Sequence, residues 1–336
     1  MSTGQVPATA RSRRLRAAAV GLVVLAGLGV LPFVGSQYLL YLNSQALFMI
    51  LAAVSLNLLV GYTGLFSYGH VAYLGVGAYT YAILTQTAHA NFWLAFFAAP
   101  VVAGLFALLT GYFCVRLTAI YFSFVTLAVA QISWATAYKW IGLTGGDSGM
   151  PGVAVPTFLM SPRAVYFFIA AVVALLVMVM HQVTHSPFGL ILNTMRENPN
   201  RALFIGVNIK RAQIVAFSLA GLMAGFAGAL FVINTRSIFP NVMLVTRSID
   251  LIIMVVLGGM YHFWGPAIGA VMIVYLMDVI KARTEYWPLV LGVLIAVVVL
   301  AMPTGVTGVV ERIYGRLKLR WEKRQNTVAV PGEGSG

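Results

Sequence analysis

The acidic, histidine and cysteine side chains of this sequence are few, and their spacing limits the chemistry that they could perform. Of 336 residues only 8 are Asp or Glu and 5 are His. We find no Ser-His-Asp set, no HExxH and no paired carboxylates of the kind used in acid–base catalysis. The single cysteine, Cys114, excludes a disulfide within the chain and provides no metal-ligand spacing. We therefore expect a non-catalytic protein with no cofactor or metal of its own.

Two acids, Asp250 and Asp278, border long apolar runs. Acids inside a membrane can serve as proton or ion sites. Arg247 and Lys281 lie close in sequence and could neutralise them. We expect both acids near the ends of membrane spans, where such neutralisation or water satisfies them.

The first polar segment that interrupts the apolar sequence runs from Asn57 to His70. Its glycines and hydrogen-bonding side chains predict a broken helix, and broken backbone at membrane depth is tolerated only where protein or a water-filled cavity covers it. We interpret the segment as lining a translocation path; an ordinary turn at the membrane surface, with His70 merely hydrogen-bonded, is the alternative. The residues assigned to the path are Asn57, Gly61, Thr63, Gly64, Ser67, His70 and, farther along the chain, Gln131.

A second polar segment, residues 143–152, contains four glycines and one proline within ten positions. This composition predicts an irregular surface loop. We expect Gly145 and Gly146 to shape an outer loop that receives a delivering partner or gates the path, with a plain connector as the alternative. No GK[ST] follows, so the segment is not a phosphate-binding loop.

The third polar segment, residues 185–211, contains signals for a short helix. Asn198 followed by Pro199 indicates a helix cap and first turn, and Gly206 indicates the C-terminal stop. A free-standing helix of about two turns is marginal in water, so it should be docked on the protein, on lipid or on a partner. The residues that would carry this docking are Arg196, Glu197, Asn198, Pro199, Arg201, Ala202 and Gly206, and all three docking sites remain open.

The elements that must position these segments are membrane-spanning helices. Hydrophobic residues make up 60% of the chain and charged residues 9%, against about 25% charged residues in soluble domains. No Asp, Glu, Lys or Arg occurs from Ala17 through Val115. The apolar runs are continuous and about 20 residues long, as helices require, whereas barrel strands would give short alternating segments. Two GxxxG pairs, Gly221 with Gly225 and Gly265 with Gly269, predict close helix packing.

We predict an all-α integral membrane protein, a polytopic bundle of about ten transmembrane helices. The expected spans cover residues 17–35, 45–61, 71–88, 92–115, 118–138, 164–184, 212–234, 248–262, 265–281 and 286–303. A re-entrant segment is an alternative near residues 258–265. The expected domains are a basic tail over residues 1–16, a transmembrane domain over 17–310 with its loop at 185–211, and a second tail over 311–336.

The basic residues are unevenly distributed between the two predicted sides. With both tails and the 185–211 loop in the cytoplasm, 15 of the 21 Lys and Arg residues lie inside. This arrangement follows the positive-inside rule and places both termini in the cytoplasm of a bacterial-type inner membrane. Because the basic clusters flank apolar spans, we read the net charge of +13 as a topology signal rather than as a nucleic-acid surface.

Taken together, these segments resemble the M-type permease subunit of branched-chain amino-acid ABC importers. Residues Gly61 to His70 followed by Gly75-Val-Gly-Ala-Tyr79 are similar to that family's G-x-x-G-L-x-S-x-G-H…G-x-G-A-Y region. Further similar stretches, in chain order, are Tyr121–Leu127, Leu143–Gly146, Ser186–Gly189, Arg196–Asn198, Gly206–Asn208, Val255–Gly259 and Trp264–Pro266. This chain departs from the family pattern at Pro199, Arg201 and Ala202, where docking to the ATPase can differ in detail.

The resemblance implies a set of partners. Such a permease forms a heterodimer with a second, H-type permease and works with two ATP-binding subunits and an extracytoplasmic substrate-binding protein. The chain has no Walker A lysine motif, so ATP would be bound by the partner subunits. The implied substrates are branched-chain or related small polar amino acids. Urea and short amides are carried by close relatives, and they form the first alternative.

Two other transporter classes remain open at this point. An ion-coupled secondary transporter needs a coupling-ion site, usually built from acids at mid-membrane depth and from helices broken in both halves. The sequence offers one clear break and no acid that we expect at depth. A passive channel would need a ring of subunits. Neither class accounts for the capped cytoplasmic helix.

Overall fold

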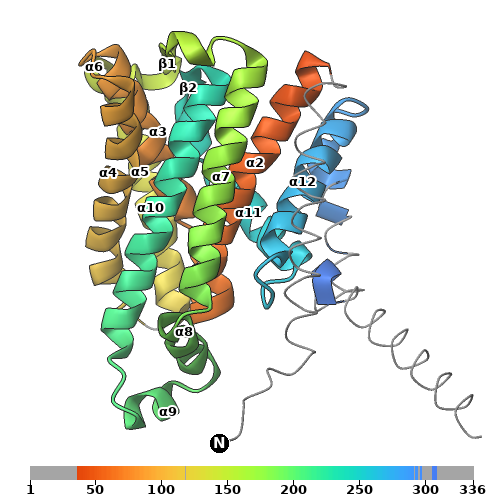
Figure 1. Ribbon diagram of the computed structural model, residues 1–336. Helices are drawn as coiled ribbons and strands as arrows, with labels where there is room; N and C mark the ends of the chain where they lie inside the picture. Colours follow the sequence, from red (N-terminus) through yellow and green to blue (C-terminus); the bar gives the residue numbers. More distant parts are fainter. Residues whose placement is uncertain (1–35, 118, 291, 294–295, 297–304, 309–336) are drawn as a thin grey trace, which may run out of the picture.

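The computed structural model describes residues 36–117, 119–290, 292–293, 296 and 305–308, which form a bundle of helices (Figure 1). The first half contains α2 (Gln37–Asn57), a π-helical turn (Leu58–Thr63), α3 (His70–Gln86), α4 (Phe92–Cys114), α5 (Ala119–Lys139) and α6 (Ile141–Thr144). The second half contains α7 (Pro162–Thr184), α8 (Pro187–Glu197), α9 (Pro199–Phe204), α10 (Ile209–Thr235), α11 (Val245–Gly258) and α12 (Gly265–Lys281). Short 3-10 turns cover Gly146–Ser148, Thr157–Leu159 and Pro240–Met243, and strands β1 and β2 cover Met150–Pro151 and Ser237–Ile238.

Five of the described helices are long and apolar enough to cross a membrane: α2 with its π-helical extension, α4, α5, α7 and α10. Three predicted spans correspond to shorter helices, α3 and α12 with 17 residues each and α11 with 14. At 1.5 Å per residue, 17 residues extend about 25 Å, less than the roughly 30 Å of a bilayer core. The predicted span at 17–35, both basic tails and most of the span at 286–303 lie outside the described residues.

The two ends of the bundle differ in structure (Figure 1). Helices α8 and α9 project from one end, which we call the α9 end. The opposite end carries α6 and a two-stranded antiparallel ribbon in which Met150 pairs with Ile238. Arg236 fixes this ribbon end, because its backbone carbonyl accepts from Val153 N at 2.9 Å and its guanidinium donates to the carbonyl of Met160 at 2.9 Å. Apart from this ribbon, the described elements are helical turns and helices, as predicted.

The bundle packs around α10 through small residues. A methyl group added at Gly221 would overlap the Cβ of Ala107 on α4, and one added at Gly228 would overlap the carbonyl oxygen of Leu74 on α3. Gly225 lies between these two helices, against Pro100 and Ala103 on one side and opposite Gly77 on the other. Close backbone approach of this kind drives helix association where water supplies no hydrophobic force. The GxxxG pair in α10 therefore packs against helices, as predicted.

The second glycine pair lies where α11 and α12 meet. A methyl group at Gly269 would overlap the carbonyl oxygen of Met254, and Gly265 is in the same kind of contact with Gly259. These two helices, joined by the tight turn of residues 259–264, form a hairpin whose turn reaches the α9 end, where Tyr261 faces Arg196. Helix α12 therefore runs between the two ends of the bundle, over the same residues as the predicted span at 265–281, and the re-entrant alternative does not fit it. The far end of α12 lies beside the start of α2, where the hydroxyl of Tyr38 donates to Asp278.

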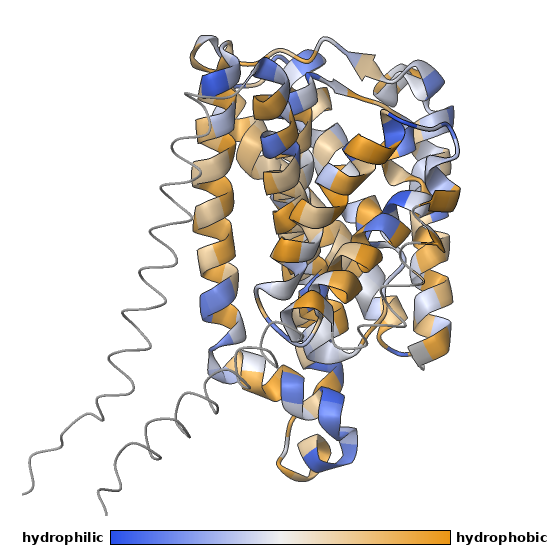
Figure 2. Ribbon diagram, turned by 90° about the vertical axis from the view of Figure 1, so that its right-hand side faces the viewer, coloured by the Kyte–Doolittle hydropathy of each residue, from blue (hydrophilic) through white to orange (hydrophobic). Residues whose placement is uncertain are grey.

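The outer faces of α4 and α5 expose large apolar side chains along their length. Leu105 and Phe113 on α4 are each 61% exposed, and Phe124 and Ile132 on α5 are each 66% exposed. Hydrophobic residues follow the helices along the bundle, whereas hydrophilic residues gather on α8 and α9 (Figure 2). An apolar surface of this extent suits hydrocarbon or another membrane subunit, and the chain is a multi-pass membrane protein.

Packing at α10 gives a test of this fold. The substitution Gly228→Ala places a methyl group on the backbone of α3, and forced overpacking costs about 1–3 kcal/mol. We expect a lower thermal unfolding midpoint for the purified protein in detergent. Gly142→Ala is the control, because nothing lies within 4 Å of the added Cβ. Equal midpoints for the two variants would contradict the close contact between α10 and α3.

Candidate functional site

The broken segment after α2 folds back along that helix. The π-helical turn ends at Gly64, whose φ of +75° is in the left-handed region that glycine adopts without strain. Residues 65–69 are non-helical, and α3 begins at His70. His70 Nε2 is 2.8 Å from the hydroxyl of Ser55, which lies eight residues, or about 12 Å, before the end of the π-helical turn. The segment therefore re-enters the bundle to the depth of Ser55 as non-helical backbone.

Hydroxyl groups of α5 satisfy the exposed backbone of this segment. Ser123 Oγ donates to the carbonyl of Phe66 at 2.8 Å, and Thr126 Oγ1 accepts from Tyr68 N at 3.2 Å. Gly69 lies so close to α5 that a methyl group there would overlap the carbonyl oxygen of Thr126. An unsatisfied backbone group in hydrocarbon costs several kcal/mol. These two hydroxyl groups allow the break to exist at membrane depth.

Arg196 connects the break to the loop between α7 and α10. Its guanidinium donates to the carbonyl oxygen of Gly61 in the π-helical turn. It also lies 5.1 Å from the ring centroid of Tyr261, in the turn between α11 and α12. The carbonyls at the C-terminal end of a helix lack intrahelical donors and carry partial negative charge, which favours a cation there. One side chain thus joins α8, the broken end of α2 and the α11–α12 turn.

Most of the residues that the sequence assigns to a path are buried inside the bundle. Ser67 and His70 are 0% exposed, Asn57 is 1% and Thr63 is 6%. Thr63 donates to Leu59 O at 2.6 Å within its own helix, and His70 bonds to Ser55. These side chains shape and stabilise the break. Gln131 differs from them, because it lies on the exposed face of α5.

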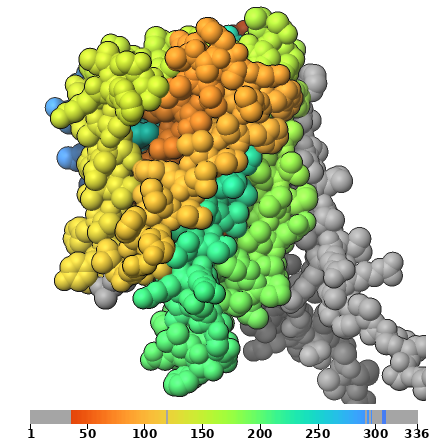
Figure 3. Space-filling view, turned by 90° about the vertical axis from the view of Figure 1, so that its left-hand side faces the viewer, coloured from red at the N-terminus to blue at the C-terminus, as the bar shows by residue number. Residues whose placement is uncertain are grey.

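The outward side of the break forms a groove with α5. The groove has a volume of about 430 Å³. Its lining residues are Gly64, Phe66, Tyr68, Ile120, Ser123, Phe124 and Leu127. The yellow and orange surface in Figure 3 shows this side of the molecule, with α5 beside α4 and the green loop helices below. The sequence pattern assigned Gly64 to the path by name and included Phe66 and Tyr68 in the path-lining segment, but it did not assign the four lining residues of α5 to the path. The hydroxyl side chains of Ser123 and Thr126, within the apolar stretch 121–127, could have indicated that α5 contacts the break.

Helix α9, in the loop between α7 and α10, has the predicted caps, and a second helix, α8, precedes it. Asn198 Oδ1 accepts from Arg201 N at 3.1 Å, α9 begins at Pro199, and Gly206 has a φ of +81°. The capped helix over 199–206 is therefore confirmed. The sequence did not predict α8, which begins after the cap residue Ser186. Ala202 is buried, whereas Leu203, Phe204 and Ile205 are 57%, 90% and 70% exposed.

Glu197 adds little to this loop. It pairs with Arg196 at 3.8 Å, but its side chain is 74% exposed, and exposed ion pairs contribute about 0–1 kcal/mol. The arrangement of Arg196 is therefore set by its contacts with Gly61 and Tyr261 rather than by this pair.

At the ribbon end, residues 145–152 form an irregular loop. Gly145 and Gly146 both have positive φ values, +74° and +58°, and Gly145 lies against the carbonyl of Gly149. Gln86, at the end of α3, donates to the carbonyl of Pro151 at 2.9 Å. This hydrogen bond connects the loop to the helix that begins at the break. Helix α3 therefore links the break to the ribbon-end loop.

In the part of the chain that the structure describes, no group of three or more His, Cys, Asp or Glu side chains could hold a metal ion. The described polar side chains at the break are Asn57, Thr63, Ser67 and the hydrogen-bonded pair of Ser55 with His70, all buried in the bundle. The geometry suits passage of a solute across a membrane.

Comparison with known proteins agrees with this interpretation. Residues 38–300 match the model of a family described as branched-chain amino acid transport system, permease component. The chain is 26% identical over 313 residues to the high-affinity branched-chain amino acid transport system permease protein LivM of Escherichia coli K12, covering 85% of this chain and 73% of that protein. It is 25% identical over 301 residues to LivM of Salmonella typhimurium LT2, covering 82% and 71%.

A more distant similarity reaches an archaeal protein. The probable branched-chain amino acid transport permease protein LivM of Methanocaldococcus jannaschii is 25% identical over 173 residues, covering 49% of this chain and 50% of its own length. No solved structure matches the chain.

The hydroxyl bonds at the break can be tested by hydrogen exchange. Replacing Ser123 with Ala and Thr126 with Val removes both bonds to residues 66–68. Of the two bonds, the one to Thr126 holds a backbone amide, that of Tyr68. Its loss, about 1–1.5 kcal/mol, should accelerate amide exchange in the 64–70 peptide by about tenfold. The control is Ser133→Ala with Thr136→Val, because these hydroxyls bond to carbonyls of their own helix. Unchanged exchange at 64–70 in the first variant would refute the bonds.

Proposed function

Because the chain belongs to the family of permease components of branched-chain amino-acid transport systems, we propose that it forms part of the translocation path of an ATP-driven importer. Its substrates are branched-chain or related small polar amino acids. It sits in a bacterial-type inner membrane with both termini and the α9 end in the cytoplasm. It is a non-catalytic subunit, and ATP is bound by partner subunits.

The observation that carries this proposal is the contact between the α8–α9 loop and the break after α2. Leu203, Phe204 and Ile205 expose large apolar side chains on a helix of six residues, while Arg196 ties the preceding helix to the break in α2. An apolar surface on so short a helix suits the groove of a partner. The partners that fit are two ATP-binding subunits, of which one would hold α9. Movement of α9 would then pass through α8 and Arg196 to the break.

A second permease would complete the path along α5. Gln131 is an uncharged polar side chain on the exposed face of a membrane-spanning helix, beside the groove-lining residues Phe124 and Leu127. Polar groups in spans usually face a bundle interior or a water-filled cavity rather than lipid. The α5 face therefore suits a heterodimer interface through which a small polar solute passes. The ribbon end, with Gly145 and Gly146, would receive an extracytoplasmic binding protein.

Urea and short amides are the alternative substrates, because the same break, groove and loop could serve them. An ion-coupled transporter would need an unpaired acid at depth. Among the described residues Asp250 lies in the first turns of α11 and Asp278 in the last turn of α12, so neither is an acid at mid-helix depth that favours that mechanism.

Uptake by the assembled complex tests the function. We expect proteoliposomes containing this chain, its second permease and its ATP-binding subunits to accumulate L-leucine only when ATP and the binding protein are supplied. Saturable leucine uptake by this chain alone, without ATP, would contradict the proposal. Uptake of urea but not of leucine would establish the alternative substrate.

Docking of α9 gives a separate prediction. Ile205→Ser removes an apolar side chain from the proposed contact, and burial of such a side chain stabilises a complex by about 1.5–3 kcal/mol. We expect the amount of ATP-binding subunit that co-purifies with the permease in detergent to fall by about tenfold or more. The matched control is Ile141→Ser at the ribbon end, where Ile141 is 76% exposed and Ile205 is 70% exposed. An equal loss in both variants would argue against docking at α9.

A further inference from the structure

Four charged residues that the proposed path does not use meet at one cavity. Arg247 and Asp250 come from the first turns of α11, and Asp278 and Lys281 come from the last turn of α12. All four line a cavity of about 450 Å³ between α2, α3, α10, α11 and α12. Sequence spacing placed each acid beside a base but did not show that the two pairs share a cavity.

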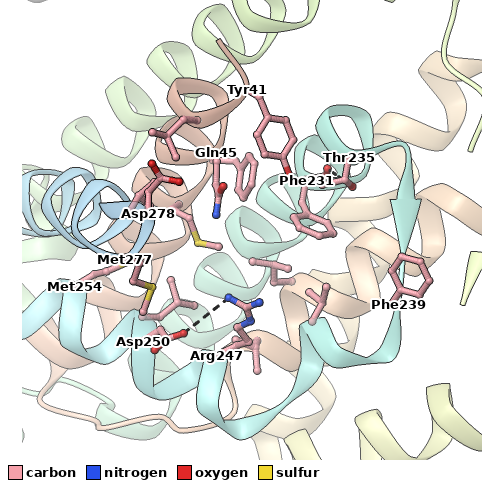
Figure 4. A pocket seen from close by; sticks show the side chains of 18 of the residues that line it. Tyr41, Gln45, Phe231, Thr235, Phe239, Arg247, Asp250, Met254, Met277 and Asp278 are labelled. Carbon is pink, nitrogen blue, oxygen red and sulfur yellow. Dashed lines mark hydrogen bonds and ion pairs between the residues drawn. The ribbon is translucent and has the colours of Figure 1, made fainter. Parts of the chain in front are cut away.

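The rest of the cavity wall is mostly apolar. Its apolar lining includes Phe48, Phe231, Leu251, Met254, Val274 and Met277. Figure 4 shows Arg247 from α11 and Gln45 from α2 pointing into the cavity, with Asp278 at its edge. Ligand pockets are commonly about 300–1,000 Å³, mainly apolar, with a few converging polar groups that orient the ligand. This cavity has that composition.

The charges are only partly engaged with one another. The Arg247–Asp250 pair is 4.0 Å long, and the side chain of Arg247 is 47% exposed. Lys281 lies 4.4 Å from the ring centroid of Trp287, and Asp278 accepts from the hydroxyl of Tyr38. A guanidinium with free donors can bind a carboxylate in bidentate geometry, which a 4.0 Å contact does not provide. Arg247 therefore retains donors for a second anion.

Two cations and two anions around one cavity give no net charge, which favours a neutral ligand that carries both signs. We propose that this cavity is a binding site within the chain for a zwitterionic α-amino acid with an aliphatic side chain. Arg247 binds the carboxylate, Asp250 or Asp278 binds the ammonium group, and the apolar wall around Phe231 and Met254 receives the side chain. The choice of an amino acid rests on the proposed function, whereas the location and the charge complementarity come from the cavity itself.

A zwitterionic lipid headgroup shares the paired charges of an amino acid. The free amino acid is favoured because the apolar wall lies within the same cavity as the charges, between five helices, where it can enclose a short side chain. A lipid headgroup would instead leave its acyl chains at the bundle surface. Phosphatidylethanolamine is therefore the competing occupant that the experiment has to distinguish.

Direct binding to the purified full-length chain tests the site. The chain is placed in nanodiscs of phosphatidylglycerol, and binding of radiolabelled L-leucine is measured by scintillation proximity. We expect saturable binding that 4-methylpentanoate and 3-methylbutylamine, which each lack one charge, do not compete at equal concentration. Arg247→Gln and Asp278→Asn should each weaken binding by about tenfold or more, because each leaves one ligand charge unpaired.

The matched controls are Arg283→Gln and Glu285→Gln, which remove exposed charges just beyond α12 that do not line the cavity. Both should bind leucine as the unsubstituted chain does, and all four variants should elute as single peaks in size-exclusion chromatography. Equal binding by all four variants would overturn the proposal. The absence of leucine binding at millimolar concentration would also overturn it. So would the finding that phosphatidylethanolamine co-purifies with the chain and is lost only in the Arg247→Gln variant.

These results separate the site from the transport function. If the assembled complex imports leucine while the isolated chain does not bind it, this inference is wrong and the proposed function stands. If leucine binds with the expected charge dependence while the complex transports only another solute, the site stands and the substrate assignment is wrong.

Discussion

The structure depends on one constraint, which is that a broken backbone at membrane depth must find its hydrogen-bond partners within the protein. The chain leaves α2 at Gly64, returns as non-helical backbone and restarts as α3 at His70. Ser123 and Thr126 bond to the returning segment, and Arg196 bonds to the last turn before it. Three elements that are distant in the sequence are held together by this requirement. The break also explains why α3 is too short to span a bilayer by itself.

The same contacts explain how a soluble partner could act on a membrane path. Because the π-helical turn leaves the Gly61 carbonyl available, a cation from the loop can bind it directly, and the ring of Tyr261 holds that cation from the other side. π-helical turns often occur at functional sites. In the proposed importer, displacement of α9 would alter the end of α2 and the α11–α12 turn together. If the packed helices can adopt two alternative packings, this shift would favour the packing in which the path is open.

Sequence patterns predicted elements better than they predicted contacts. Continuous apolar runs gave α4, α5, α7 and α10 to within a few residues, and the cap and stop at Asn198 and Gly206 gave α9. Periodicity could not show that Ser67 points into the bundle while Phe66 lines a groove, because that depends on how the segment folds back. Nor could it show that Asp278 shares a cavity with Arg247, since 31 residues and a tight turn separate them.

Arg196 is the side chain that joins the loop to the break, and its role is tested most directly by coupling measured in the complete complex. Arg196→Met keeps the length of the side chain but removes the donor to Gly61, and Arg211→Met, at the exposed start of α10, is the control. Both ATP hydrolysis and leucine uptake are measured in proteoliposomes. We predict that Arg196→Met hydrolyses ATP while its uptake per ATP falls by about tenfold, a loss equivalent to roughly 1.4 kcal/mol of coupling, and that Arg211→Met is unchanged. Normal uptake per ATP in Arg196→Met would contradict the account.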